Sequence, residues 1–405
     1  MGYGVGVDLG TTFTSAAVSG PGGTRVVSLS PEMLVPSAVC RAPDGSLLTG
    51  AAAAGADPAL VVGGFKRRLG DPTPLVLGGE PYSAATLMAA QLRDVLDHVS
   101  GTEGAPPDTV VLTCPAIWGP YRREHFVEVP RLAGVGEFRL ITEPEAAATH
   151  YSVERRLGEG EIVAVYDLGG GTFDTTILRM RAGTVEILGT PEGIEHLGGV
   201  DFDETLLAHL NDRLDGAISE LEPDDAASAT TLARIRAMCV RAKEDLSLAP
   251  EVRLAVPLPS GPREVTVTRA EFEGMIRPSV LLTTDALHRT VSSAGLRADN
   301  LSAVLLAGGS SRIPLVSELV SEEFGKPVRV TLHPKFTVAL GAAAIAGRST
   351  GPAAAAPATG PEVAGAPTTP ATPEPASRRR TLALVAAAVL VLVIVAIVLV
   401  VVGTA

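Results

Sequence analysis

The stretch Val163-Ala-Val-Tyr-Asp-Leu-Gly-Gly-Gly-Thr172, near the middle of this 405-residue chain, repeats a pattern that the chain first shows at Gly4-Val-Gly-Val-Asp-Leu-Gly-Thr-Thr12. Each copy is an apolar run, then Asp-Leu-Gly, then a turn rich in Gly and Thr, and a second apolar run follows at 15–18 and at 175–178. Short apolar runs bounded by glycine are typical of buried strands. The sequence therefore predicts the same strand–turn–strand unit twice.

The repeated turn has the chemistry of a phosphate site. Glycines let the backbone approach a phosphate closely with its N–H groups turned toward it, and threonine hydroxyls add hydrogen bonds. The aspartate of each copy, Asp8 and Asp167, suits a hydrated magnesium ion, because hard cations prefer oxygen ligands. One such turn could simply be a tight turn, but two facing copies could hold one polyphosphate from both sides.

Strand-like runs alternate with helical patterns along the rest of the chain. The expected strands lie at 4–7, 109–112, 162–166, 185–188 and 303–306, and the expected helices lie at 83–98, 145–156, 203–214 and 232–246. This alternation predicts an α/β fold. A third glycine element, Leu305–Pro314, runs from a strand through Gly308, Gly309 and Ser310 toward a helix, which suits a nucleoside or phosphate edge.

Together the three glycine elements resemble the ATP-binding core of the actin-like ATPase superfamily, in which two ribonuclease-H-like lobes flank a nucleotide cleft. The chain has no Gly-x4-Gly-Lys-Ser/Thr motif, so it is not a P-loop protein. A dinucleotide fold is excluded as well, because Gly169–Gly171 lies in an expected hairpin and not in a strand-to-helix turn. We expect lobe I over about 1–160 and lobe II over about 161–347, in one nucleotide-binding domain, 1–347.

Composition restricts the partners and the compartment. The formal net charge is −12 and aromatic residues make up 4% of the chain. An acidic body lacks the basic stripe that binding to a phosphate backbone requires, so we expect no nucleic-acid partner. Cys40, Cys114 and Cys239 lie far apart without paired spacing, which excludes a disulfide scaffold or a zinc motif and favours a reducing, cytosolic compartment.

The C-terminal part of the sequence predicts a membrane anchor. Residues 348–380 form a Pro/Ala-rich segment that we expect to be a disordered linker, and it ends in the basic run Arg378–Arg380. The uncharged stretch 381–402 would span about 33 Å as a helix, enough to cross a bilayer. Because basic residues stay on the cytoplasmic side, we expect a tail-anchored, single-pass protein of the cell membrane with its N-terminal domain in the cytoplasm.

At the level of whole motifs, the body resembles the nucleotide-binding domain of the 70-kDa heat-shock protein family, the DnaK-type chaperones. Its most specific motifs are Asp167-Leu-Gly-Gly-Gly-Thr-Phe-Asp174 and His196-Leu-Gly-Gly-Val-Asp-Phe-Asp203. Further matching segments occur in order along the chain: 6–12, 35–39, 65–70, 110–116, 140–148, 241–247, 308–314 and 340–343. The resemblance implies ATP and ADP as ligands, with Mg²⁺ and K⁺ as ions.

The resemblance also implies a catalytic set. Lys66 would reach the γ-phosphate and steady the attacking water, and its charge would stabilise the transition state. Glu143 would orient water and the metal ligands, Asp8 and Asp167 would hold the hydrated metal ions, and Thr172 would contact the cations beside the phosphates. From the residues alone, Lys66 could instead be a surface lysine of a basic trio, and Glu143 a carboxylate at a helix start.

A larger set is implied to bind the nucleotide. Its members are Gly10, Thr11, Thr12 and Phe13 of the first turn, Gly169, Gly170 and Gly171 of the second, Gly198 and Gly199 facing the phosphates and ribose, Arg241, Lys243 and Ser247 at the ribose and adenine edge, and Gly308, Gly309, Ser310 and Arg312, of which the arginine would pack on the adenine. We expect Arg241, Lys243 and Ser247 to share one helix face, although such a run alone is more often a solvated face. Pro115 and Arg123 would relay the nucleotide state across the domain.

The chain also departs from the family pattern. The peptide-binding β-sandwich and helical lid are expected to be missing after 347, and the segment between Lys66 and Pro115 is shorter. Val240 stands where the family usually has Glu, and His333-Pro-Lys335 stands where it has Asn-Pro-Asp. We expect the reversed charge at Lys335 to change contacts to the ribose or base.

These observations predict a membrane-tethered, Mg-dependent ATPase, slow in turnover, that acts as a chaperone-family switch through unidentified protein partners. Partners of the co-chaperone or nucleotide-exchange type are implied by the resemblance only. Three alternatives remain open: an actin-like filament-forming ATPase, a non-hydrolysing ATP-sensing scaffold, and a phosphotransferase for small molecules. The last would need a general-base aspartate between the lobes, for which the sequence has no signature.

Overall fold

The computed structural model describes residues 2–57, 60–155, 157–181, 184–222, 225–330 and 334–349, which all belong to one compact unit, Met1–Ala354. The predicted anchor 381–402 lies outside these residues, as does the expected linker from residue 350 onward. Within the described ranges, no helix combines the length and the apolar character that crossing a bilayer requires.

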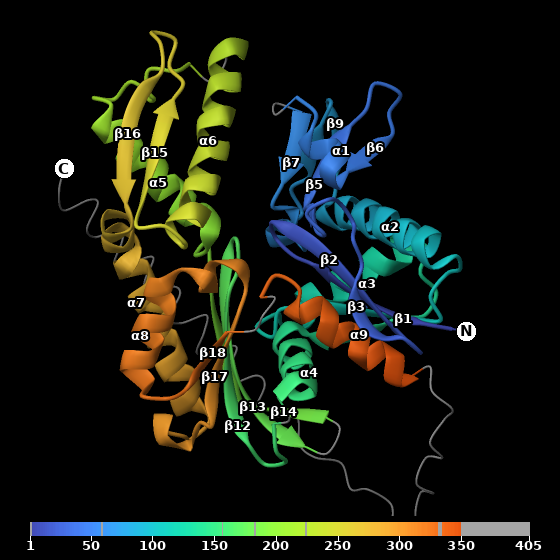
Figure 1. Ribbon diagram of the computed structural model, residues 1–405. Coiled ribbons are helices and arrows are strands. Elements are labelled where there is room, and N and C mark those ends of the chain that lie inside the picture. Colours follow the sequence, from blue (N-terminus) through green and yellow to red (C-terminus); the bar gives the residue numbers. More distant parts are fainter. Residues whose placement is uncertain are drawn as a thin grey trace, which may run out of the picture. The chain divides into compact units, whose positions relative to one another are not determined.

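Two β-sheets with the same strand order form the core of the unit (Figure 1). The first sheet has the order β11-β10-β1-β2-β3, and its strands are β1 (Gly4–Leu9), β2 (Phe13–Gly20), β3 (Gly23–Val26), β10 (Thr109–Cys114) and β11 (Arg139–Thr142), with β4 (Val35–Pro36) paired to β2. The second sheet has the order β18-β17-β12-β13-β14, and its strands are β12 (Ile162–Leu168), β13 (Thr172–Arg181), β14 (Thr184–Glu195), β17 (Ala303–Ala307) and β18 (Val328–Val330). The predicted duplication is therefore present.

The pairing directions match as well. β1 pairs antiparallel with β2 and parallel with β10, and β12 pairs antiparallel with β13 and parallel with β17. In the first hairpin Asp8 lies opposite Ser15, and in the second Asp167 lies opposite Asp174. Each Asp-Leu-Gly segment thus ends a central strand, which puts the aspartate and the following glycines at the same edge of each sheet.

Helices cover both faces of each sheet. They are α1 (Gly50–Ala54), α2 (Ala84–Glu103), α3 (Pro120–Leu132), α4 (Glu143–Arg155), α5 (Gly199–Arg213), α6 (Ala226–Leu246), α7 (Arg269–Ser293), α8 (Pro314–Phe324) and α9 (Thr337–Ser349). Apolar side chains of α2 and α3 form one core with the first sheet, and those of α7 and α8 form another with the second. The predicted strands and helices coincide with these elements, and the mixed α/β class is consistent with the actin-like fold.

The remaining elements are small. They are β5 (Ala38–Arg41), β6 (Leu47–Thr49) and β7 (Val61–Gly63), which form a three-stranded sheet, the hairpins β8 (Leu75–Leu77) with β9 (Glu80–Tyr82) and β15 (Glu251–Val256) with β16 (Arg263–Thr268), and the 3-10 turns η2 (Phe65–Arg68), η3 (Ala298–Asn300) and η4 (Gly309–Arg312). In Figure 1, β5 and β7 extend above the first sheet and β15 and β16 extend above the second.

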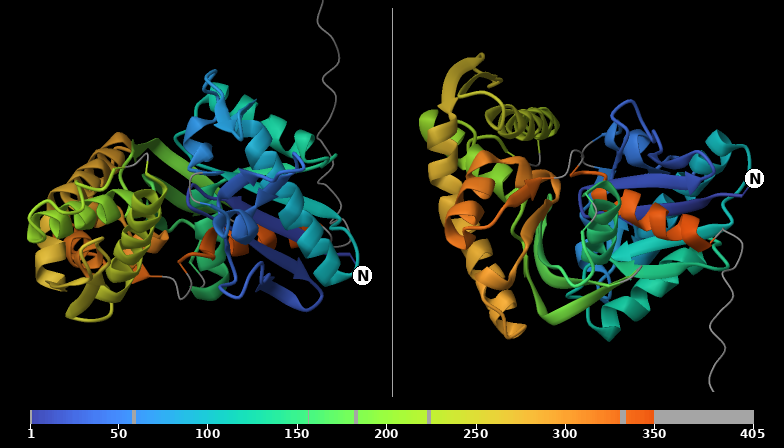
Figure 2. Two further views of the ribbon diagram at one scale, coloured as in Figure 1. Left: turned by 90° about the horizontal axis from the view of Figure 1, so that it is seen from above. Right: turned by 60° about the horizontal axis from the view of Figure 1, so that its bottom comes forward.

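Helices α4 and α9 join the two sheets and exchange places. Helix α4 follows β11 of the first sheet but packs on the second, where Ala148 and Tyr151 contact the core around Val163. Helix α9 follows β18 of the second sheet but packs on the first, so that a Cβ added to Gly6 would lie 2.2 Å from the backbone nitrogen of Ala343. Figure 2 shows α9, in red, beside the blue strands of the first sheet in both views.

This exchange corrects the predicted division into lobes. The boundary at about 161 assigns α9 to lobe II, but α9 lies on the first sheet. A boundary drawn along the chain cannot express two helices that cross over. We therefore use "first half" for the first sheet with α1–α3, α9 and β5–β9, and "second half" for the second sheet with α4–α8, β15 and β16. Helix α9 also extends to Ser349, two residues into the expected linker.

Candidate functional site

A cleft between the two halves contains most of the predicted site. Its cavity volume is about 330 Å³, within the range of pockets for small molecules and cofactors. The predicted residues that line it are Asp8, Gly10, Thr11, Thr12, Phe13, Lys66, Glu143, Asp167, Gly169, Gly170, Gly171, Thr172, Gly199, Lys243, Ser247, Gly308, Gly309 and Ser310. Segments that are far apart in the sequence thus meet around one cavity.

The two glycine turns face each other across this cleft. A Cβ added to Gly170 would lie 2.2 Å from the hydroxyl oxygen of Thr12, so a side chain there would fill the space between the turns. A Cβ added to Gly10 would lie 2.3 Å from the carbonyl oxygen of Phe13, within the first turn itself. The glycines therefore leave the backbone accessible to a ligand that enters from either half, which fits a polyphosphate.

The second turn is held in place by its own half. The backbone N–H of Gly199 donates to Gly169 at 3.1 Å, that of Val200 donates to Gly170 at 2.7 Å, and the Ser310 hydroxyl donates to Gly169 at 2.8 Å. Gly198 does not line the cavity, because it packs behind the turn: a Cβ there would lie 2.6 Å from the Gly171 nitrogen. Its contact with the phosphates and ribose stays a prediction, and in this structure Gly198 supports the turn from behind.

Lys66 lies at the floor of the cleft with only 5% of its surface exposed. Its ammonium group is 2.7 Å from Oε1 of Glu143 and 4.0 Å from Oδ1 of Asp8, and it lies over the Trp118 ring at 5.7 Å from the centroid. Burial lowers the pKa of Lys66, but the carboxylates of Glu143 and Asp8 outweigh burial and raise it above the ordinary value. Lys66 is therefore a fixed positive charge beside the phosphate turns and not a surface lysine.

The carboxylates near Lys66 outnumber the cation. Burial raises the pKa of Asp8 to about 6 against the opposing effect of Lys66, and burial with the repulsion of Glu143 and Asp174 raises the pKa of Asp167 well above its usual range. Asp174 is buried, its pKa is raised to about 8 by burial and by Glu143, and its Oδ1 atom has no hydrogen-bond partner in the described protein.

This cluster of buried carboxyl groups fits a hydrated divalent cation, whose positive charge would favour their ionised form and lower the raised pKa values. Asp8 and Asp167 lie in the lining of the cavity, one from each half, where they were predicted to hold such an ion. Among the described residues, no group of three or more His, Cys, Asp or Glu side chains is placed to hold a metal ion by itself. The fit to magnesium therefore rests on the charge and on the unpaired oxygen of Asp174.

Asp174 ends the motif 167–174, but the sequence analysis assigned it no role. Its signal was the pairing register, because the residue directly opposite the predicted metal ligand of a hairpin faces the same site. Arg67, the neighbour of Lys66, was also missed. It lines the cavity from the first half and crosses to the second, where it donates to the Gly171 carbonyl and contacts Nδ1 of His196 at 3.1 Å.

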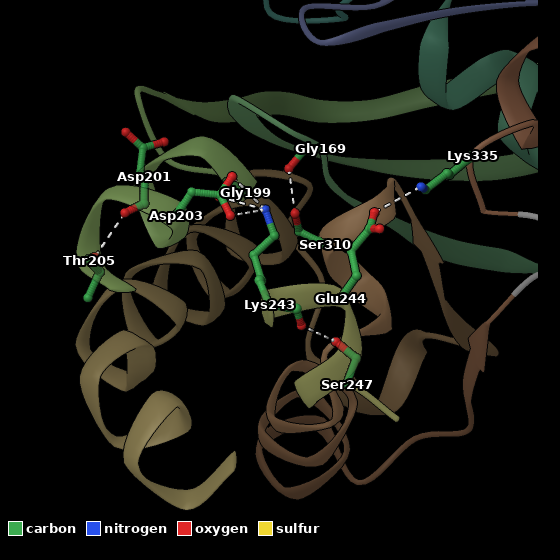
Figure 3. A network of polar contacts seen from close by, with 10 residues as sticks. All are labelled: Gly169, Gly199, Asp201, Asp203, Thr205, Lys243, Glu244, Ser247, Ser310 and Lys335. Atoms are coloured by element: carbon green, nitrogen blue, oxygen red, sulfur yellow. Dashed lines mark hydrogen bonds and ion pairs between the residues drawn. The ribbon is translucent and has the colours of Figure 1, made fainter. Parts of the chain in front are cut away.

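Helix α6 forms the far wall of the cleft. Figure 3 shows Lys243 donating to the Gly199 carbonyl at 2.9 Å and to Asp203 at 2.8 Å. Burial raises the pKa of Asp203 to about 6, against the opposing charge of Lys243. Ser247 lies one turn further along the helix and donates to the Lys243 carbonyl at 3.1 Å.

Two predicted arginines do not line the cavity. Arg241 is exposed because it lies two residues before Lys243, and residues two apart do not share a helix face. The residues of α6 that do face the cavity are Val240, Lys243, Glu244 and Ser247.

Arg312 is exposed as well. Ser310 and Ile313, three residues apart, line the cavity, and Arg312 lies between them and points away. In the segment 333–335, which differs from the family pattern, Lys335 lines the cavity and His333 lies outside the described residues.

Comparisons of the sequence with known proteins identify its relatives. A family model described as "Hsp70 protein" matches residues 4–356. The chain is 32% identical over 352 residues to the chaperone protein DnaK of Thermotoga petrophila, with 84% of this chain and 58% of the relative covered. The DnaK proteins of Thermotoga maritima and Thermotoga neapolitana match with the same identity and coverage. The chain thus spans little more than half the length of these relatives.

Proposed function

The chain belongs to the Hsp70 protein family, with its body matching the family's nucleotide-binding domain, and we propose that this body binds Mg·ATP and hydrolyses it to ADP. One observation supports the proposal above all. The buried pair of Lys66 and Glu143 lies at the floor of a cleft whose two walls are facing glycine turns. A cleft of this kind offers a fixed cation for a terminal phosphate and backbone N–H groups for the remaining phosphates.

The described side chains divide the chemistry between them. Asp8, Asp167 and Asp174 would hold magnesium, which when bound neutralises charge on the phosphate oxygens. Lys66 is directed at the space between the turns, where its charge stabilises the negative charge that develops on the transferred group. Glu143 fixes the Lys66 ammonium group by the 2.7 Å contact and offers a carboxylate to orient the attacking water.

The proposed output is a movement of the two halves. ATP between the turns would be bound by both halves at once, and loss of the terminal phosphate removes part of that connection. A protein partner would read this movement. We further propose, from the apolar run 381–402 and the preceding Arg378–Arg380, that the chain is tethered to the membrane with its body in the cytoplasm. Recovery of the full chain in the soluble fraction after cell lysis would contradict the tether.

The hydrolysis proposal is tested with two lysine variants of the full chain. Lys66→Ala removes the cation from the cleft, and Lys326→Ala is the matched control, because Lys326 contacts Asp299 outside the cavity. We expect slow Mg-dependent turnover in the wild type, a fall of about 100- to 1,000-fold in Lys66→Ala with ATP still bound, and no change in Lys326→Ala. ATP binding without any wild-type turnover would instead support a non-hydrolysing sensor, and ATP-dependent sedimentation would support a filament former.

A further inference from the structure

Lys335 lies where the chain crosses from the second half back to the first. It belongs to the short segment 334–336 between β18 and α9, directly before the helix that packs on the first sheet. Pro334 before it is buried, and its own stem runs along the cleft wall, with Cε 3.6 Å from where a Cβ of Gly309 would lie. Lys335 therefore lies at the junction of the halves, with its stem against Gly309 of the second half and the helix that follows it on the first sheet.

The ammonium group of Lys335 contacts both walls of the cleft. Its Nζ lies 3.1 Å from Oε1 of Glu244 on α6, in the second half, and 5.5 Å from the ring centroid of Phe13 on β2, in the first half. Figure 3 shows Lys335 reaching toward Glu244 from the opposite side of the site. All three residues line the same cavity as Lys66 and the glycine turns. One side chain thus bridges the mouth of the proposed nucleotide site.

The bridge runs from Phe13, at the end of the first glycine turn, to Glu244 on α6. If the phosphates lie between the glycine turns, the rest of the nucleotide extends toward α6, whose cavity-facing stripe includes Val240, Glu244 and Ser247. Glu244 belongs to this stripe. A contact from Lys335 to Glu244 therefore crosses the path by which a nucleoside leaves the cleft.

Opening of the cleft must break one of these contacts. Phe13 moves with the first half and Glu244 with the second, so Lys335 cannot stay in contact with both when the halves separate. The bridge of Lys335, Glu244 and Phe13 consequently links nucleotide release to separation of the halves. The side chains of Lys335 and Glu244 are 33% and 55% exposed, so the pair is screened by solvent and its contribution is modest.

We propose that Lys335 is a positioning residue that retains the bound nucleotide by bridging Glu244 and Phe13 across the mouth of the cleft. This inference rests on the proposed nucleotide function. The bridge raises the barrier to release and does not itself take part in hydrolysis. A screened ion pair with an added cation–π contact predicts an effect of about three- to tenfold on the rate of release.

The test measures release of radiolabelled ADP from the full chain after a chase with excess unlabelled ADP. The variants are Lys335→Ala, Glu244→Ala, the exchange Lys335→Glu with Glu244→Lys, and the conservative Lys335→Arg, with Lys326→Ala as the control. We expect release to be about three- to tenfold faster in the two single alanine variants. The exchange and Lys335→Arg should return the rate to within about twofold of the wild type, because charge pairing is restored.

Two results would overturn the inference in distinguishable ways. If the wild type binds ADP but the alanine variants release it at the wild-type rate, or the exchange is no slower than the single variants, Lys335 does not retain the nucleotide and the proposed function stands. If the wild type binds no ADP, the proposed function and the bridge fail together. Thermal unfolding of each variant is measured alongside, since a lost bridge at an exposed pair should leave the fold intact.

Discussion

The two glycine hairpins of this protein share a strand order and an Asp-Leu-Gly sequence but differ in what faces the aspartate. In the first hairpin, Asp8 lies opposite Ser15, accepts from the Thr113 hydroxyl at 3.2 Å and has Lys66 nearby. In the second, Asp167 lies opposite Asp174, whose Oδ1 atom has no hydrogen-bond partner in the described protein. The duplicated scaffold thus carries a cation on one side and surplus carboxylate on the other.

This difference teaches how the halves divide the work. The first half places one buried cation, Lys66, beside the phosphate turns, although Glu143 and Asp8 already compensate its charge. The second half has no such cation beside Asp167 and Asp174 and can satisfy these carboxylates only with an added one. A ligand that brings both an anion and a cation, such as Mg·ATP, matches the two sides together. We therefore expect neither half to bind the nucleotide well without the other.

The largest expected effect, on the free energy of unfolding, comes from separating α4 and α9 where the two helices cross. A Cβ added to Gly341 of α9 would lie 1.8 Å from the carbonyl oxygen of Ala146 on α4, so Gly341→Leu forces the crossed helices apart. We expect a loss of about 3 kcal/mol in the free energy of unfolding, measured by denaturant titration. The control Gly274→Ala lies on α7 with nothing within 4 Å of the added Cβ, and it should stabilise by up to about 1 kcal/mol, because Ala favours a helix over Gly. Equal changes in the free energy of unfolding for the two variants would contradict close packing of α4 against α9.

A smaller effect is expected from closing the space between the turns. Gly170→Ala places a methyl group against Thr12, and the positive-φ strain that often accompanies glycine replacement does not apply at this position. Overpacking of this kind should weaken ATP binding about 10- to 100-fold. The control Gly22→Ala has open space around its Cβ and should bind ATP like the wild type. Equilibrium binding of ATP measures both, and unchanged affinity in Gly170→Ala would mean that the turns do not clamp the ligand.

The smallest effect is expected from replacing Asp174 and Ser15, the residues opposite the two aspartates. Burial raises the pKa of Asp174 to about 8, so above that pH the folded protein holds a buried charge without a partner. We expect Asp174→Asn to gain about 1 kcal/mol in unfolding free energy relative to the wild type in that pH range, and its Mg-dependent turnover to fall. Ser15→Ala changes the equivalent position of the first hairpin and should leave the Mg²⁺ dependence of turnover unchanged. If both variants changed the Mg²⁺ dependence alike, the hairpins would not differ in the way their contacts suggest.

Much of this arrangement could be predicted from local pattern. The apolar runs before each Asp-Leu-Gly gave the hairpins, because strand length and glycine turns are encoded within a few residues. Lys66 was placed at the site by its resemblance, and the structure puts it there, buried against Glu143. The expectation that Arg241 shares a helix face with Lys243 and Ser247 was wrong, because Arg241 is exposed and does not line the cavity. Helical spacing alone would have separated Arg241 from that face.

Other features depend on contacts between distant parts of the chain. The exchange of α4 and α9 follows from small residues such as Gly341 and Ala146 that meet only in three dimensions. The pairing of Lys335 with Glu244 joins residues 91 positions apart, and nothing in either local sequence indicates the other. Asp174 needed the strand register before its place opposite Asp167 could be seen.

Calorimetric titration of the full chain with ATP, once in Mg²⁺ and once in excess EDTA, tests the central claim most directly. Two unlike hairpins that share one Mg·nucleotide predict a single site per chain, with affinity that falls at least tenfold when the metal is removed, because the carboxylates of the second half then face the phosphates without a cation. Equal affinity with and without Mg²⁺, or no binding in either condition, would contradict it.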